Sequence, residues 1–269
     1  MDDCNPPLLS AAATEACFRF PVPRAIVQLL QHCSGPDASV EHGPDSRLHN
    51  ATGLLVSSAL SRPANCPAEL LLIGETGMDG VVCGCVMHDP KLAGEMPLAL
   101  FDPSTGRGDY LGLDTRRSIG VLIGMQLAQL TGAQLDDARA IAEEMGFDPD
   151  ELPAEQPLDV RPRVPPGWRF AMTADGLGVV ARAEHFSPEQ EYDQEPDAFD
   201  APDLAEARRR VEEALAGGWA ASALWHLRNA TVFVESPVEA AVLRRLAEPT
   251  YAALGRDQLG AVLFTGRCC

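Results

Sequence analysis

The fold is decided by the stretch Leu70-Leu-Leu-Ile-Gly-Glu-Thr-Gly77-Met-Asp79-Gly80-Val-Val-Cys83-Gly-Cys85-Val-Met87. Two apolar runs of strand length, at 69–73 and 81–87, flank a turn that is rich in glycine. Short apolar runs separated by turn residues are typical of strands that are neighbours in one antiparallel sheet. The stretch therefore predicts a hairpin.

Further strand-like runs surround this hairpin, at 53–60, 97–101 and 109–113. Turn residues separate them, including Asp89-Pro90 and the segment 102–106. A helical pattern at 8–32 precedes the runs, and helical patterns at 118–130 and 135–145 follow them. The polar segment 36–52 contains Gly43-Pro44 and is predicted as a loop. This part of the chain is predicted to be α+β, with a meandering antiparallel sheet and flanking helices.

A second pattern begins after residues 147–167, which are rich in proline and charge and are predicted to be a linker. Runs at 168–172 and 179–183 predict a second hairpin. Helices are predicted at 204–216, 219–227 and 238–253, and strands at 231–234 and 259–264. The predicted organisation is a domain at 1–146, the linker at 147–167, and a second small α+β domain at 168–269.

The charge is strongly acidic: 21 basic and 39 acidic residues give a net charge of −18. The acidic excess is spread over both parts of the chain. Such a surface repels phosphate groups and anionic lipid, which argues against binding to nucleic acid or membrane. It attracts basic proteins, although solubility alone is a sufficient reason for the same composition.

The sequence predicts neither a secretory signal nor a membrane span, and it predicts no catalytic lysine. Asp2 and Asp3 stand where a secretory signal would carry basic residues, and no apolar run approaches the ~18 residues of a membrane span, so we expect a cytoplasmic protein. The eight cysteines are scattered, as is typical of free thiols. Lys91 is the only lysine, and its context fits neither a P-loop nor a Schiff base.

Two motifs suggest specific chemistry. Gly74-x-x-Gly77-x-x-Gly80 follows a strand, but the next segment is strand-like, so no helix N-terminus is expected to hold a pyrophosphate. Cys83-x-Cys85-x-x-His88 could ligate a metal, yet alternation along a strand favours two buried thiols on one face. A redox role of Cys268-Cys269 stays open. We predict no catalytic residue, no metal and no cofactor.

The first part resembles the SUKH superfamily, known for bacterial immunity proteins and fungal regulators. The resemblance covers about residues 15–130 and rests on four features. These are Phe20-Pro21 leading into a helix that ends near Gly35, the stretch Ile73-Gly-x-x-Gly-x-Asp-Gly80, the strand Pro97-Leu-Ala-Leu-Phe-Asp102, and Gly108-Asp-Tyr110 before a closing helix at Ser118.

The resemblance implies a non-enzymatic immunity protein that neutralises a bacterial toxin, and the acidity permits a basic toxin of nuclease type. The predicted partner surface consists of carboxylates in turns, namely Asp79, Asp89, Glu95, Asp102 and Asp109. In the acidic stretch 189–206, Tyr192 and Phe199 are predicted aromatic anchors. Two alternatives remain: a regulatory module with no toxin partner, and an enzyme whose site lies at the junction of the two domains.

Overall fold

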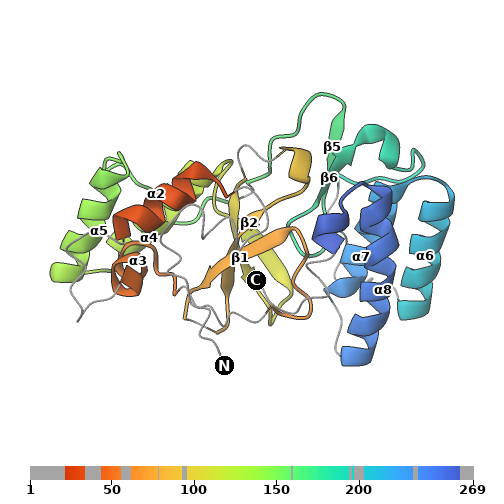
Figure 1. The fold of residues 1–269 in the computed structure, drawn as a ribbon, viewed down its shortest axis with the longest axis horizontal. Coiled ribbons are helices and arrows are strands. Elements are labelled where there is room, and N and C mark those ends of the chain that lie inside the picture. The colour runs from red at the N-terminus through yellow and green to blue at the C-terminus, as the bar shows by residue number, and fades with distance from the viewer. Residues whose placement is uncertain are drawn as a thin grey trace, which may run out of the picture.

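The computed structural model describes residues 22–33, 44–55, 62–77, 79–92, 96–158, 160–193, 196, 203–232 and 236–260. The predicted class is confirmed: the protein is α+β, with a four-stranded antiparallel sheet, a separate two-stranded sheet, and helices around both. The larger sheet lies between one group of helices, α2–α5, and a second group, α6–α8 (Figure 1).

The larger sheet is a meander in which each strand pairs with the next. Its strands are β1 (Leu70–Glu75), β2 (Val82–Val86), β3 (Leu98–Asp102) and β4 (Arg107–Tyr110). The hairpin predicted from the opening stretch is confirmed as β1–β2, in which Leu70 pairs with Val86. The predicted strand at 109–113 is displaced, because β4 already begins at Arg107. From the predicted run at 53–60, Leu55 forms one bridge to Glu75, and residues 56–60 lie outside the described part.

Both faces of this sheet are covered. Leu71, Cys83, Cys85 and Leu98 belong to one apolar cluster, which also contains Ile119 of α4. The alternate residues on the strands belong to a second cluster and include Leu72, Val82, Ala99, Phe101 and Tyr110. This cluster also contains Leu177, from the turn between β5 (Trp168–Ala171) and β6 (Val179–Arg182). Side chains alternate between the faces of a strand, so a strand covered on both sides is apolar throughout, as in β2.

The first group of helices comprises α2 (Arg24–Cys33), α3 (Pro44–Thr52), α4 (Thr115–Leu127) and α5 (Ala133–Glu144). The loop predicted at 36–52 is wrong for its second half, because α3 occupies it. Pro44 suits the first turn of a helix, and Leu48 and Ala51 are buried one turn apart. Helix α4 begins three residues before its predicted start, because Asp114 caps it by accepting a hydrogen bond from the Arg117 amide.

The second part contains β5 (Trp168–Ala171) and β6 (Val179–Arg182), which form the predicted hairpin. Helix α6 (Leu204–Ala216) is confirmed with its predicted bounds. Helix α7 (Ala220–Thr231) begins one residue later and ends four residues later than predicted, and α8 (Pro237–Ala253) begins one residue earlier. Ser236 and Glu239 form a capping box at the start of α8.

The two strands predicted in this part are wrong where the structure describes them. Thr231 closes α7, and residues 257–260 are helical. Residues 233–235 and 261–264 lie outside the described part. Two short 3₁₀ turns complete the fold, η1 (Pro90–Leu92) and η2 (Ala183–His185).

The segment predicted as a linker carries no helix or strand in its described residues. It nevertheless packs on α4, since a Cβ added at Gly124 would lie 2.2 Å from the Pro153 carbonyl oxygen. Among the described helices, none has the length and apolar character to cross a membrane.

Candidate functional site

A cluster of buried charged and polar side chains lies between the larger sheet and the second part of the chain. We call it the junction network. On the side of the sheet, the members lie on β4 or next to β1 and β2: Glu69, His88, Asp89 and Tyr110. On the side of the second part, they lie in the β5–β6 turn, on α7 and α8, and in the turn after α8: Asp175, Arg228, Tyr251 and Arg256.

Arg228 lies at the centre of the junction network and is 2% exposed. Its Nη2 lies 2.6 Å from Oδ1 of Asp175, and its Nε donates to Oδ2 of the same carboxylate at 2.8 Å. Its Nη1 donates to the Gly178 carbonyl and lies 3.7 Å from Oε2 of Glu69. Burial opposes the charge of Arg228, but Asp175 and Glu69 raise its pKa above the ordinary value. The guanidinium is therefore held by Asp175 and the Gly178 carbonyl, which belong to the second part of the chain, and it contacts the first part through Glu69.

Glu69 and Asp89 accept further hydrogen bonds across the junction. The Tyr251 hydroxyl donates to Oε2 of Glu69 at 2.9 Å, and burial, followed by the Glu69 charge, holds the pKa of Tyr251 well above its usual value. Arg256 donates from Nε to Oδ2 of Asp89 at 3.3 Å and from Nη2 to the Val180 carbonyl at 2.6 Å.

His88 extends the network in a single tautomer. The Tyr110 hydroxyl donates to the Leu177 carbonyl at 2.6 Å, so Nε2 of His88, 2.7 Å from that hydroxyl, is the donor to it. The imidazole is then neutral, with its Nδ1 an acceptor. Burial lowers the pKa of His88 well below 6.5, and the charges of Arg228 and Arg256 lower it further.

The charges of the network nearly balance, with three carboxylates facing two guanidiniums and a neutral histidine. Buried ion pairs of this kind contribute little net stability, because desolvation offsets their attraction, but removing one partner is costly. Each group contacts another member or a backbone carbonyl, while Nδ1 of His88 and Nη1 of Arg256 are buried without a hydrogen-bond partner among the described residues. The arrangement fixes how the two parts of the chain dock.

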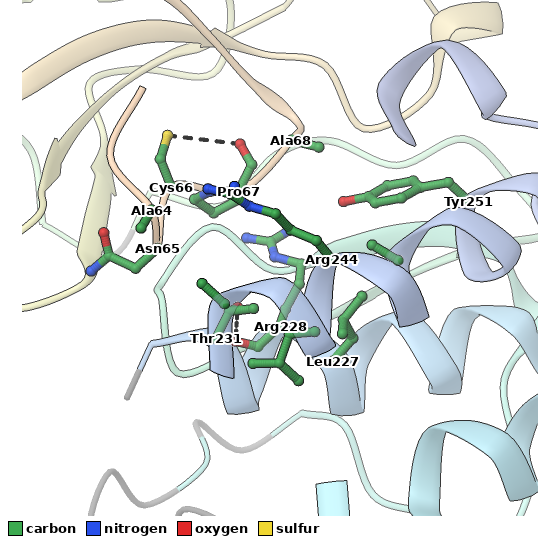
Figure 2. Close-up of a pocket in the computed structure, with 13 residues that line it drawn as sticks. Ala64, Asn65, Cys66, Pro67, Ala68, Leu227, Arg228, Thr231, Arg244 and Tyr251 are labelled. Atoms are coloured by element: carbon green, nitrogen blue, oxygen red, sulfur yellow. Dashed lines mark hydrogen bonds between the residues drawn. The ribbon is translucent and has the colours of Figure 1, made fainter. Parts of the chain in front are cut away.

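A small pocket opens beside the network, between residues 64–68 and helices α7 and α8. Its volume is about 30 Å³. Figure 2 shows the side chains of Arg228 and Arg244 extending from the helices toward the segment 64–68. The Tyr251 ring lies at the right of this view, opposite Asn65 and Cys66. The junction therefore has a pocket, as the enzyme alternative would require, but its lining contains no histidine or carboxylate.

The predicted partner residues lie in several places. Asp79 is exposed in the β1–β2 turn, where it adopts a φ of 47°, and Asp102 begins the β3–β4 turn. These two turns are at the same end of the meander. Asp109 is exposed on β4. The Asp102 carboxylate accepts hydrogen bonds from the side chain and amide of Ser104, which lower its pKa.

Two of the predicted contact residues are not on the surface. Asp89 is 6% exposed because Arg256 and the Lys91 amide bind its carboxylate. Tyr192 is 0% exposed, packed against Phe186 and Trp225 and bonded to Ser222. Glu95 and Phe199 lie outside the described residues.

The Cys83-x-Cys85-x-x-His88 motif has separate environments for its members. Cys83 and Cys85 are buried in the cluster shared with the first group of helices, and burial raises the pKa of Cys83 to about 12. His88 instead faces Tyr110 in the junction network. Within the described ranges, no group of His, Cys, Asp and Glu side chains has the geometry of a metal site. Cys268 and Cys269 are outside those ranges.

The network's charged members were not predicted as a group. One available signal was a charge inside or next to an apolar run: Glu69 precedes Leu70-Leu-Leu-Ile, and Arg228 lies in Ala223-Leu-Trp-His-Leu-Arg-Asn-Ala. Charged residues are rarely buried unless paired, so such positions indicate a buried partner.

The neutral histidines predict a pH dependence of stability. Burial lowers the pKa of His226 to about 4, and His88 is lowered as well, so the folded protein binds fewer protons than the unfolded chain below pH ~6.5. The free energy of unfolding should therefore fall as the pH drops from 7 toward 4, by at most ~1.4 kcal/mol per pH unit for each histidine. Urea unfolding at pH 7.0 and 5.0 measures the difference.

His226→Gln should make that difference smaller, whereas the matched substitution of exposed His49, His49→Gln, should leave it unchanged. Equal pH dependence in the wild type and in His226→Gln would contradict the burial of a neutral imidazole at this position.

No family model matches the chain, and no curated protein matches it.

Proposed function

We propose that this protein is a non-enzymatic binding protein whose acidic surface recognises a basic protein partner. The observation that carries the proposal is that the acidic excess of the chain is not neutralised inside the fold. Arg228 and Arg256 form ion pairs with carboxylates inside the junction network. Arg208, Arg209 and Arg210 form ion pairs with glutamates of their own helix, α6. The junction network buries three carboxylates with its two guanidiniums, so nearly all of the net charge of −18 lies outside it.

The end of the sheet that carries the β1–β2 and β3–β4 turns is the best candidate for the contact. We call it the turn-end surface, formed by Leu55, Glu75, Asp79 and Asp102. Leu55 is 37% exposed and bridges to Glu75 at the edge of the sheet. An apolar side chain beside carboxylates offers a basic partner both burial and charge complementarity.

The specific form we propose is an immunity protein of the SUKH type that neutralises a basic toxin. Support comes from the resemblance of residues 15–130 and from the order of elements, in which helices α2 and α3 are followed by four antiparallel strands and the closing helix α4. A basic toxin active on nucleic acid presents a positive site, which a surface of opposite sign can block.

The test begins by capturing partners of the purified protein from its source organism at low salt and identifying them by mass spectrometry. For the recovered protein, titration calorimetry at ~50 and ~300 mM salt should show affinity falling with salt, because the attraction is electrostatic. Asp79→Asn combined with Glu75→Gln should weaken binding by about tenfold. Asparagine is chosen because it tolerates the positive φ at this position.

The matched control is Asp136→Asn combined with Glu143→Gln, which removes two exposed charges from α5 and should change the affinity less than about twofold. For the immunity role, co-expression should restore growth to cells that make the captured toxin. An acidic partner, binding that is insensitive to salt, or equal losses in both double variants would defeat the proposal.

A further inference from the structure

The pocket beside the junction network has partly apolar walls and lies between the two parts of the chain. Its lining combines apolar residues, among them Ala68, Leu243 and Ala247, with the polar residues Asn65, Thr231 and Arg244 and with Arg228 and Tyr251 of the junction network. A volume of about 30 Å³ is close to the space of one water molecule or one methyl group. The apolar part of this lining suits an aliphatic group.

Arg244 gives this pocket a cation. It is half-buried on the face of α8 that also carries Ala240, Leu243, Ala247 and Tyr251, and its side chain extends toward residues 64–68 (Figure 2). Across the described part of the chain, no acidic side chain forms an ion pair with Arg244.

The neighbouring polar groups are engaged elsewhere. Arg228 is held by Asp175 and the Gly178 carbonyl, and the Tyr251 hydroxyl donates to Glu69. Asn65 donates its side-chain amide to the Pro103 carbonyl. Arg244 is therefore the group in the pocket lining that can bind a ligand without breaking the junction network.

We propose that this pocket binds a short-chain aliphatic carboxylate, with its carboxylate on the Arg244 guanidinium and its methyl end against Ala68, Leu243 and Ala247. The guanidinium fork matches a carboxylate in two parallel hydrogen bonds. A phosphate dianion fits less well, because Arg244 is the one unpaired cation among the described lining residues and the net charge of −18 repels a dianion more strongly than a monoanion. The pocket is too small for more than the end of an aliphatic chain.

A ligand in this place would touch both parts of the chain at once, namely residues 64–68 and helices α7 and α8. A ligand that binds only when the two parts are docked must stabilise the docked state by mass action. The site thus gives a small metabolite of this class a way to tighten the junction, independently of any partner at the turn-end surface.

The experiment is an NMR titration of the full chain with sodium propionate at constant ionic strength, followed through the methyl signals of Ala68, Ala240 and Ala247. We expect saturable shifts with a dissociation constant in the low millimolar range, as fits one charge-assisted contact and little buried area. Propionamide, which has the same shape without the charge, should bind at least about tenfold more weakly.

Arg244→Gln should weaken propionate binding by about tenfold or more, whereas Arg245→Gln, its exposed neighbour, should leave it within about twofold of the wild type. If Arg244→Gln perturbs folding, Ala240→Leu fills the pocket from the same helix and should abolish the shifts. The proposal is overturned if propionate gives no saturation, if propionamide binds equally well, or if Arg244→Gln binds normally. Tighter binding of N-acetylalanine than of propionate would assign the site to a peptide C-terminus and would overturn the assignment to a free acid.

Discussion

Arg228→Met is expected to lower the free energy of unfolding by about 3–5 kcal/mol, because it leaves two carboxylates buried without their cation. Asp175 and Glu69 are each 1% exposed, and both face the Arg228 guanidinium. Water cannot replace that partner without opening the junction. Urea unfolding at pH 7 followed by circular dichroism gives the value, with an unchanged native spectrum as the check on the starting fold.

The matched control is Arg208→Met, which removes an arginine whose ion pair with Glu212 is exposed on α6, and it should cost less than about 1 kcal/mol. Arg228→Met combined with Asp175→Asn should recover part of the loss. The asparagine oxygen can still accept from the Leu177 amide and the Thr173 hydroxyl, while one uncompensated charge is gone. A cost for Arg228→Met below about 1 kcal/mol would show that the junction network is not buried as described.

The elements of the fold could be predicted because their signals are local. The β1–β2 hairpin follows from apolar runs on either side of Gly77-Met-Asp79-Gly80, and α6 from a charged helical pattern that ends at Gly217-Gly218. Helix α3 was missed because its helical character depends on burial of Leu48 and Ala51 against α4 and α5, which no local pattern reveals.

The junction network could not be predicted in the same way, because its pairs are far apart in sequence. Tyr251 and Glu69 are separated by 182 positions, and Arg256 and Asp89 by 167. Asp89-Pro90 has the composition of an exposed turn, which is why Asp89 was assigned to the partner surface. Its burial follows from Arg256, and Tyr192 is likewise removed from the acidic surface by the aromatic cluster around Trp225.

The turn between β5 and β6 gives the second large expected effect, through Gly176→Ala. Gly176 has a φ of +78°, and a Cβ added there would lie 2.3 Å from the Gly108 carbonyl oxygen on β4. That oxygen cannot move freely, because Gly108 pairs with Phe101 in the sheet and donates its amide to the Asp175 carbonyl at 2.7 Å. We expect a loss of at least about 3 kcal/mol, from the positive φ together with the displaced turn.

Gly132→Ala separates these two causes. Gly132 has a φ of +63° and a ψ of −143°, but an added Cβ would meet no atom within 4 Å, so this variant should lose only the backbone strain, about 1–3 kcal/mol. The excess loss in Gly176→Ala then measures how firmly the β5–β6 turn is docked on β4. That turn carries Asp175, so displacing it also moves the carboxylate that binds Arg228. In the Gly176→Ala background, Arg228→Met should therefore lower the free energy of unfolding much less than it does in the wild type. Equal losses at Gly176 and Gly132, or fully additive losses with Arg228→Met, would mean that the turn and the buried guanidinium are independent and that the two parts of the chain are not docked through them.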